Sequence, residues 1–318
     1  MTRPAFIRFN HIKKQYGTVE ALKDVSIDVI QGELFGFIGP DGAGKTTLFR
    51  ILTSLVLPDA GSAFIGSLDV VKDYKKIRKS TGYMPGRFSL YSDLTVEENL
   101  QFYARIFKTS VKENYDLISD IYRQIEPFKK RRAGDLSGGM KQKLALSCAL
   151  IHNPEVLVLD EPTTGVDAVS RMEFWELLKK MQKKGITILV STPYMDEASL
   201  CDRVALMEHG ELLAVDTPAC IEKSFTGNLL AVKSNQMYGL LSDLPAGRQV
   251  LEQFPDATQV FRFGEFIHIT FQSENTAGII EDLTNYLKSK GHQEIQISPI
   301  KPVIEDCFLA LMDQPAKR

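Results

Sequence analysis

Cysteine is scarce in this chain, and the few that occur show no metal-binding pattern. Among 318 residues there are four cysteines, and no two of them have the spacing of a zinc site. Two lie in apolar segments with a helical pattern, which is typical of buried thiols. The scarcity argues against a disulfide-stapled fold and predicts reduced cytosolic thiols at Cys148, Cys201, Cys220 and Cys307.

Long hydrophobic runs and an excess of one charge are also missing. No apolar stretch approaches the ~18 residues of a membrane-spanning helix, and residues 1–6 do not resemble a signal peptide. The formal net charge is −2, which gives no reason to expect nucleic-acid binding, and the basic run at 129–132 is interpreted as a solvated surface. The length suffices for two domains. If the protein works at a membrane, a separate chain must therefore supply the channel.

A glycine-rich segment at residues 39–47 has the form of a phosphate-binding loop. It lies between an apolar run at 34–38, which predicts a buried strand, and a helical segment at 47–52. Glycines let the backbone close around phosphate oxygens, and successive N–H groups at a helix start bind anions. We expect Lys45 to reach the β- and γ-phosphates and the Thr46 hydroxyl to ligate Mg²⁺. A turn without a ligand is the alternative, which the complete pattern disfavours. The expected nucleotide contacts are Gly39, Asp41, Gly42, Ala43, Gly44, Lys45, Thr46 and Thr47.

A second predicted strand ends in two adjacent carboxylates. Residues 156–159 are apolar and bounded by prolines, which predicts a parallel core strand. Asp160 is expected to bind Mg²⁺ directly or through water, and Glu161 to polarise the attacking water as general base. A solvated loop is the alternative. Beside a phosphate loop the hydrolytic interpretation is favoured, with Glu161 and Lys45 as the catalytic residues.

Ser137, Gly138 and Gly139 precede a segment of helical composition. Serine is a good N-cap, and a hydroxyl, glycine N–H groups and a helix dipole all attract an anion. An ordinary capped helix explains the tripeptide taken alone. Together with the phosphate loop and the two carboxylates, however, it resembles the signature of the ATP-binding cassette (ABC) family of transporter ATPases. The resemblance covers about residues 5–215 and implies that the signature binds the γ-phosphate held by a second cassette.

The resemblance implies roles for further residues. Tyr16 falls where the family stacks an aromatic ring on adenine, although a half-buried strand aromatic is the alternative. Asp167 lies in the loop that crosses the dimer interface in the family. Residues 95–100, with a capping-box pattern at Thr95 and Glu98, correspond to the helical arm that contacts the membrane subunit.

Two positions depart from the family pattern. The family usually has a glutamine that helps to hold Mg²⁺ and the attacking water where this chain has Gly86. It usually has a histidine that contacts the γ-phosphate where this chain has Pro193, which offers no N–H donor. Losing one preorganised donor costs about 10²–10³ in rate. Drift at tolerant positions, with activity kept by Glu161, is the alternative to the favoured interpretation of a slow or specialised site.

Alternating strands and helices over residues 5–215 predict a parallel sheet with helical cover. Residues 5–35 alternate as short strands, residues 92–152 are mostly helical, and a helix at 171–184 is expected to stop at Gly185. The predicted fold class is α/β. In family terms it is a P-loop NTPase with a RecA-like parallel sheet core and with antiparallel β and helical subdomains.

After residue 217 the pattern changes. The expected order, strand–helix–strand–strand–helix–strand, predicts a small C-terminal α+β domain of the ferredoxin-like kind. We expect a nucleotide-binding domain at residues 1–222 and an accessory domain at 223–318. His268 and His292 are expected to be structural or exposed. Strands are predicted at 229–233, 258–263, 265–271 and 294–297, helices at 277–290 and 303–312, and helical potential after 233.

The favoured interpretation is the ATP-binding subunit of an ABC transporter, similar to exporters whose cassettes pair with separate membrane proteins. The resemblance implies ATP and Mg²⁺ as cofactors and integral membrane permease subunits as partners. It also implies a second cassette, with a heterodimer favoured over a homodimer, and a cytoplasmic position at the inner face of the cell membrane. No nucleic-acid partner and no span of its own are expected.

Two alternatives to this interpretation stay open. One is a nucleotide-binding structural partner with negligible hydrolysis, which Gly86 and Pro193 favour and Glu161 opposes. The other is a soluble ABC ATPase outside transport. The chain lacks the coiled-coil or zinc inserts and the second fused cassette that such proteins carry.

Overall fold

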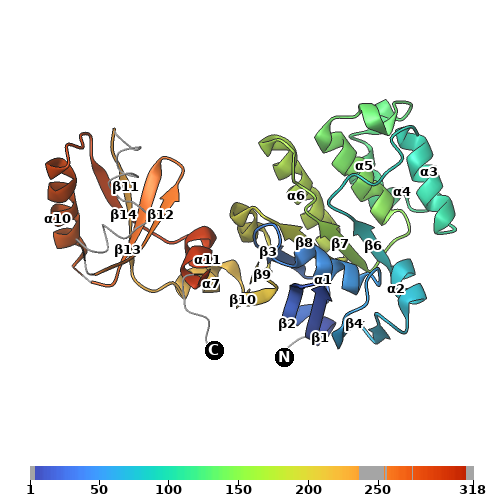
Figure 1. Cartoon of the computed structure of the whole chain (residues 1–318). Helices are drawn as coiled ribbons and strands as arrows, with labels where there is room; N and C mark the ends of the chain where they lie inside the picture. Colours follow the sequence, from blue (N-terminus) through green and yellow to red (C-terminus); the bar gives the residue numbers. More distant parts are fainter. Residues whose placement is uncertain (1–3, 236–253, 255, 274, 313–318) are drawn as a thin grey trace. The chain divides into compact units, whose positions relative to one another are not determined.

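The computed structural model describes residues 4–235, 254, 256–273 and 275–312. The chain divides into two compact units, Met1–Ala219 and Cys220–Arg318, and each is described by itself (Figure 1). Among the described residues, no helix combines the length and apolarity that crossing a bilayer requires.

A six-stranded sheet forms the centre of the first unit, in the order β10-β9-β3-β8-β7-β6. The five strands β9, β3, β8, β7 and β6 run parallel to one another, and the edge strand β10 pairs antiparallel with β9. Strands β3, β7 and β8 are buried along their whole length, as expected of apolar runs covered on both faces. The bounds are β3 (Leu34–Ile38), β6 (Thr81–Met84), β7 (Val156–Asp160), β8 (Thr187–Thr192), β9 (Arg203–Glu208) and β10 (Glu211–Asp216).

A four-stranded antiparallel sheet, in the order β2-β1-β4-β5, accompanies the central sheet. Its strands alternate buried and exposed residues, so that one face contributes to the core. They are β1 (Ala5–Tyr16), β2 (Val19–Ile30), β4 (Ala60–Ile65) and β5 (Leu68–Asp69).

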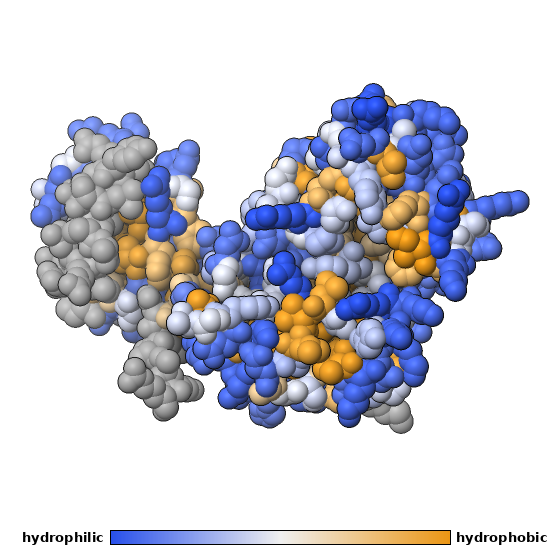
Figure 2. Space-filling view, turned by 45° about the vertical axis from the view of Figure 1, so that its right-hand side comes forward, coloured by the Kyte–Doolittle hydropathy of each residue, from blue (hydrophilic) through white to orange (hydrophobic). Residues whose placement is uncertain are grey.

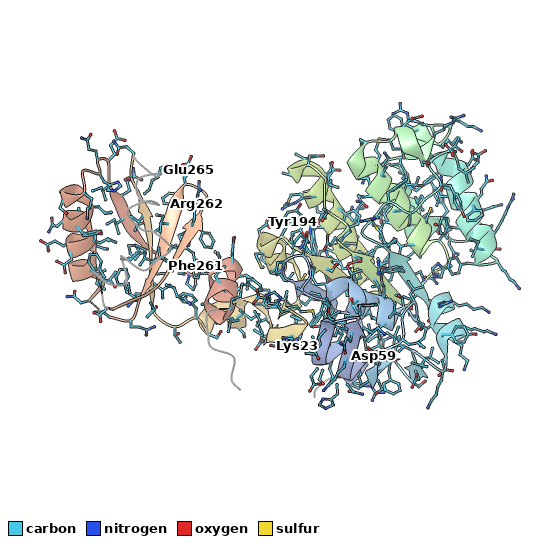
Figure 3. All side chains as sticks on the ribbon, viewed as in Figure 1. Lys23, Asp59, Tyr194, Phe261, Arg262 and Glu265 are labelled. Carbon is cyan, nitrogen blue, oxygen red and sulfur yellow. The ribbon has the colours of Figure 1, made fainter. Side chains whose placement is uncertain are left out.

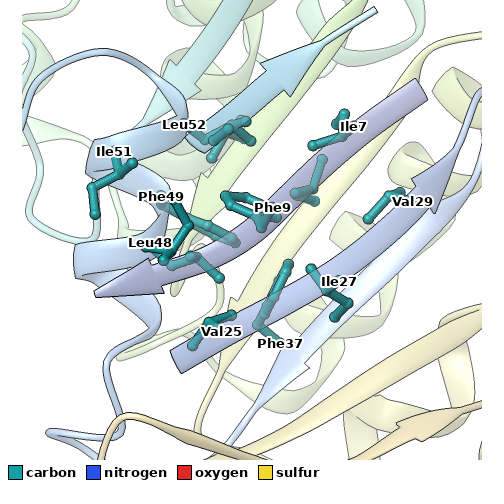
Figure 4. Packing of buried hydrophobic residues seen from close by; sticks show 14 of the residues in the cluster. Ile7, Phe9, Val25, Ile27, Val29, Phe37, Leu48, Phe49, Ile51 and Leu52 are labelled. Carbon is teal, nitrogen blue, oxygen red and sulfur yellow. The ribbon is translucent and has the colours of Figure 1, made fainter. Parts of the chain in front are cut away.

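The main core joins this antiparallel sheet to the central sheet and to helix α1 (Lys45–Leu52), as Figure 4 shows. Phe37 of β3 lies between two other aromatic rings, with centroids 6.4 Å from Phe9 and 5.3 Å from Phe49, both in edge contact. Edge-to-face pairs of this kind stabilise by about 0.5–1.5 kcal/mol beyond their buried area. This packing holds α1, and with it the loop at its N-terminus, against the sheet.

Helices form the remainder of the first unit. α3 begins with the predicted capping box, in which Thr95 Oγ1 accepts from the Glu98 N–H and the Glu98 carboxylate accepts from the Thr95 N–H. α6 begins three residues before the predicted start, because the Asp167 carboxylate caps the Ser170 N–H. The helices, with the short 3-10 turns, are α2 (Tyr74–Ser80), α3 (Val96–Ile106), α4 (Tyr115–Tyr122), η1 (Glu126–Phe128), η2 (Ala133–Asp135), α5 (Gly138–Leu150), α6 (Ala168–Lys183) and η3 (Met195–Leu200).

The second unit contains an antiparallel sheet in the order β12-β13-β11-β14. This order and these directions match the ferredoxin-like arrangement. The helical potential after residue 233 lies outside the described residues. The elements are β11 (Asn228–Lys233), β12 (Ala257–Phe263), β13 (Phe266–Phe271), α10 (Thr276–Ser289), β14 (Gln296–Ile300) and α11 (Ile304–Met312), preceded by α7 (Pro218–Lys223).

The two faces of this sheet are covered by different helices. Leu283 and Leu287 of α10 pack with Ile267 and Ile269 of β13. His268, which points to the opposite face because strand residues alternate, has its Nδ1 2.7 Å from Asp306 Oδ1 in α11. His292 is buried, with Nδ1 3.1 Å from Ser234 Oγ. The strand predicted at 294–297 instead spans Gln296–Ile300 and includes Pro299, which an edge strand tolerates.

Candidate functional site

The glycine-rich loop connects β3 to α1, as its sequence pattern predicts. The Gly39 N–H donates to the Thr192 carbonyl at 3.3 Å, which ties the start of the loop to the end of β8. Gly44, the residue before α1, has a φ of 102° and leaves no room for a Cβ, which would lie 2.5 Å from the Ala21 carbonyl oxygen. Glycine is therefore required where the loop turns into the helix.

Lys45 places a buried ammonium group inside this loop. Its Nζ donates to the carbonyl oxygens of Gly39 at 2.7 Å and Pro40 at 2.9 Å, and lies 3.6 Å from Glu161 Oε1. Burial lowers the pKa of Lys45, and the nearby carboxylates of Glu161 and Asp41 oppose that shift. A desolvated ammonium among carbonyl dipoles is a strong attractor for an anion such as phosphate.

Thr46 and Asp160 meet at the carboxyl end of β7. The Thr46 hydroxyl donates to Asp160 Oδ1 at 3.0 Å, and the Ser191 hydroxyl donates to the same oxygen at 2.7 Å. Asp160 ends β7 and is paired with Ser191, the second-last residue of the adjacent parallel strand β8, at the sheet edge where α/β sheets place ligands. Ser191 was not singled out from the sequence, although a hydroxyl at the end of an apolar strand is a usable signal.

These residues fit a magnesium ion. Mg²⁺ uses one or two carboxylates, waters and substrate phosphates and does not need a full cage of protein ligands. Among the described residues no group of three or more His, Cys, Asp or Glu side chains is placed to hold a metal. The Thr46–Asp160 pair is therefore the arrangement in the described residues that suits such an ion beside a bound phosphate.

Glu161 follows β7 in a left-handed backbone conformation, with a φ of 48°. Its N–H donates to the Ser191 hydroxyl at 2.9 Å and lies 3.1 Å from the Ser191 carbonyl oxygen, which holds the backbone in place. The side chain is 23% exposed and lines the cleft over the loop. Backbone strain that the surroundings enforce is common where a side chain must be aimed at a substrate.

The loop and Glu161 line a cleft of about 770 Å³. Figure 2 shows that hydrophilic residues cover most of the visible surface of the first unit, with apolar residues in separate patches. Two segments that the sequence did not single out also line the cleft: the start of β2, including Lys23, and the β9–β10 turn, with His209. Lys23, labelled in Figure 3, pairs with Glu211 at 2.9 Å, so that these segments are joined.

Tyr16 lies at the end of β1 and is 45% exposed. It is not among the residues that line the cleft, which begin at Thr18 on the same hairpin. The Lys14 Nζ lies 5.4 Å from the centre of its ring.

The remaining predicted site residues gather away from the cleft. Ser137 caps α5 and accepts from the Met140 N–H, as predicted. A Cβ on Gly139 would lie 2.8 Å from Ser170 Oγ, and one on Gly138 would lie 3.4 Å from the Gly165 carbonyl oxygen. The signature tripeptide therefore packs closely against the loop that contains Asp167 and the start of α6. None of Ser137, Gly138, Gly139 and Asp167 lines the cleft.

Gly86 lies beside the backbone of Asp160 and Glu161. A Cβ on Gly86 would be 3.2 Å from the Asp160 carbonyl oxygen and 3.7 Å from Glu161 Cβ. Pro193 directly follows Thr192, the last residue of β8. A longer side chain at residue 86 would therefore start next to the backbone carbonyl of Asp160 and the Cβ of Glu161.

The proteins that this chain resembles are ATP-binding proteins, in agreement with the phosphate-binding geometry of the cleft. The family model described as ABC transporter matches residues 22–164. A Nod factor export ATP-binding protein I of Burkholderia orbicola is 36% identical over 309 residues, covering 96% of each chain. The chain belongs to the ABC transporter ATP-binding family. This ABC chain is also 35% identical over 315 residues to the probable multidrug ABC transporter ATP-binding protein YbhF of Escherichia coli, of which it spans about half the length, 52%.

Solved ABC cassettes share the fold of the first unit. A dimeric ATP-binding cassette in a post-hydrolysis state, bound to ADP and Pi, has a TM-score of 0.60 and 27% identity and covers 66% of this chain and 98% of its own. The cbiO1 protein of Clostridium perfringens has a TM-score of 0.62 and 26% identity, covering 79% of this chain and 99% of its own. The predicted family and fold class are thus confirmed.

Proposed function

We propose that this ABC chain binds and hydrolyses ATP through residues 1–222 and drives transport by separate membrane subunits. The observation that carries the proposal is that Lys45, Thr46 and Glu161 line one cleft, with Asp160 bound to the Thr46 hydroxyl beneath it. These four groups come from two sequence segments and match the needs of phosphoryl transfer: a cation for the phosphates, a metal site and a base.

In this proposal the N–H groups of the loop and Lys45 hold the phosphates. Thr46 and Asp160 hold Mg²⁺, which when bound supplies positive charge against the phosphate oxygens. Glu161, whose carboxylate lies 3.6 Å from the Lys45 ammonium, polarises the attacking water. Tyr16 stacks on the adenine ring through the ring face opposite Lys14; the residue is 45% exposed at the end of β1.

A second cassette completes each site in this proposal. Ser137, Gly138, Gly139 and Asp167 carry the groups that bind an anion or cap a helix, yet they lie away from the chain's own cleft. Their close packing supports one shared surface that faces another subunit's nucleotide. The solved cassette bound to ADP and Pi is dimeric, in agreement with such a pairing.

Export is the favoured direction. The relatives in E. coli and Burkholderia are named for multidrug transport and Nod factor export, and a further relative in Mycobacterium tuberculosis, 39% identical over 213 residues, is named for doxorubicin resistance. The membrane subunits would dock on the arm that includes α3, with residues 223–318 as an accessory domain.

The chain's own site is proposed to be slow. Gly86, beside Asp160 and Glu161, and Pro193, directly after β8, offer no side-chain donor, so a heterodimer with a second, faster site is favoured. The same two residues support the second candidate function, a nucleotide-binding partner that hydrolyses little.

Purification of the chain together with proteins encoded by its neighbouring reading frames tests the proposal. We expect a complex with a polytopic membrane protein and Mg²⁺-dependent ATP hydrolysis. A chain that binds no ATP, alone or in any such complex, would refute it.

A further inference from the structure

A buried carboxylate that is not itself a predicted site residue connects three segments of the candidate site. Glu197, in η3, is 2% exposed. Its Oε2 accepts from the Thr192 hydroxyl at 2.5 Å and from the Thr163 hydroxyl at 3.1 Å. Its Oε1 lies 3.5 Å from Arg171 Nε in α6. A carboxylate this deep in the protein is costly unless its partners are fixed, so the four residues form one unit.

Each partner of Glu197 touches a different part of the site. Thr192 ends β8, and its carbonyl oxygen accepts from the Gly39 N–H at the start of the phosphate loop. Thr163 lies two residues after Glu161. Arg171 lies in the first turns of α6, and its N–H donates to the carbonyl of Asp167 at 2.9 Å. Glu197 therefore joins the phosphate loop, the segment with the general base and the segment that ends at Asp167.

The outer side of this unit is held by Arg171 as well. Its Nη2 donates to Asp196 Oδ2 at 2.8 Å, and its guanidinium carbon lies 4.5 Å from the ring centre of Tyr194, which Figure 3 labels. The Tyr194 N–H donates to the Thr192 hydroxyl at 3.0 Å. Arg171 thus contacts residues that follow Pro193, and Thr192, which precedes Pro193, is bound by Glu197 and by the Tyr194 N–H. At Pro193 this chain lacks the histidine of its family.

We propose that Glu197 is a positioning residue for ATP hydrolysis. It holds the loop at 161–167 against the Pro193 loop. Through these contacts, the binding of a nucleotide to the phosphate loop changes the position of Asp167. The inference rests on the proposed function. It goes beyond that function because Glu197 touches neither the cleft nor any predicted site residue directly. Turnover depends on Glu197 whichever of the two nucleotide sites is faster. The loop at 161–167 carries Glu161, which serves this chain's own nucleotide, and Asp167, which faces the nucleotide of the partner cassette.

The test compares full-length Glu197→Gln and Thr163→Val with wild type, in the complex with its partner subunits. We expect kcat to fall about 10–100-fold in both, because small misplacements of reacting groups cost that much, while the Kd for ATP changes less than about twofold. Thr163→Ser, which keeps the hydroxyl, should retain most of the activity, and the exposed Glu176→Gln should retain all of it. A kcat for Glu197→Gln within about twofold of wild type, or a Kd that rises as much as kcat falls, would overturn the inference.

A second readout does not depend on turnover. We expect ATP with Mg²⁺ to slow amide hydrogen exchange at residues 39–47 and 161–167 in wild type, but only at 39–47 in Glu197→Gln. Equal protection of 161–167 in both proteins would overturn the inference while leaving ATP binding intact. A wild-type chain without ATP-dependent protection at 39–47 would instead refute the proposed function itself.

Discussion

The Lys45 ammonium lies 3.6 Å from the Glu161 carboxylate, although the two residues belong to different loops of the first unit. Lys45 is 3% exposed and Glu161 is 23% exposed, so one is enclosed by the phosphate loop and the other opens to the cleft. A phosphate that binds the loop would compete with the Glu161 carboxylate for the Lys45 ammonium.

Replacement of Lys45 by alanine should weaken ATP binding at least tenfold, or about 1.4 kcal/mol. The N–H groups of the loop cannot by themselves balance the charge of three phosphates. A titration with a fluorescent ATP analogue measures the change. Lys130→Ala, at a side chain that is 83% exposed, is the control and should bind as wild type does. Equal affinities for Lys45→Ala and wild type would contradict the nucleotide assignment.

Replacement of Gly86 and Pro193 by the residues usual in the family should raise the rate of ATP hydrolysis. Pro193→His supplies a donor, and Gly86→Gln starts a side chain 3.2 Å from the Asp160 carbonyl oxygen, where a small shift accommodates it. We expect the double variant to exceed wild type by about tenfold or more, since one preorganised donor accounts for about 10²–10³ in rate. Steady-state ATPase assays on the isolated chain decide the point. If wild type already turns over as fast as the double variant, the slow-site interpretation is wrong.

Two substitutions should differ in effect within the assembled transporter. Ser137→Arg places a bulky cation where the signature would approach the partner's nucleotide, and should abolish most ATPase activity. Glu161→Gln removes the proposed base of the site that we propose to be slow, and should reduce activity much less. Reconstitution of each variant with its partner cassette and membrane subunits gives both rates. A loss for Glu161→Gln as large as that for Ser137→Arg would show that this chain's own site does the hydrolysis.

Loss of the α3 capping box should destabilise the helical arm. Thr95→Ala removes the hydroxyl that accepts from the Glu98 N–H, and an N-cap substitution of this kind costs about 0.5–2 kcal/mol. Thr95→Ser keeps the acceptor and serves as the control. Urea unfolding followed by circular dichroism should rank wild type and Thr95→Ser together, with Thr95→Ala below. An unchanged midpoint for Thr95→Ala would mean that tertiary contacts alone hold the helix start.

Acid should destabilise the first unit partly through His152. Burial lowers the pKa of His152 from its ordinary value of 6.5 to about 4, and its ring stacks on Phe107 with centroids 3.7 Å apart. Because the unfolded chain binds this proton more readily, the His152 contribution is fully present above about pH 6.5 and is lost as pH falls toward 4.

His152→Phe, which keeps the stacking, should therefore lose less stability than wild type between pH 7 and pH 5. Urea midpoints at the two pH values measure the difference. His209→Gln, at an 83% exposed side chain, should behave as wild type. An equal acid loss in His152→Phe and wild type would exclude His152 as the cause.

The sequence alone determined the family and the local chemistry of the site. The phosphate loop, the Asp160–Glu161 pair, the Ser137 cap and the strand at 34–38 are all readable because each depends on neighbours within a few residues. The ends of several elements were less readable. The start of α6 at Ala168 depends on a cap by Asp167, and the length of β14 depends on its edge position, which permits Pro299.

Only the tertiary structure decided which distant residues meet. Ser191 and Glu197 bind groups that lie about 30 residues away along the chain, because parallel strands bring their carboxyl ends to one edge of the sheet. The packing of Gly139 on Ser170 likewise arises from helix contact. Such contacts cannot be predicted from a periodic pattern in the sequence. The role of a buried hydroxyl or carboxylate depends on its hydrogen-bond partners in space and not on the residues next to it in the chain.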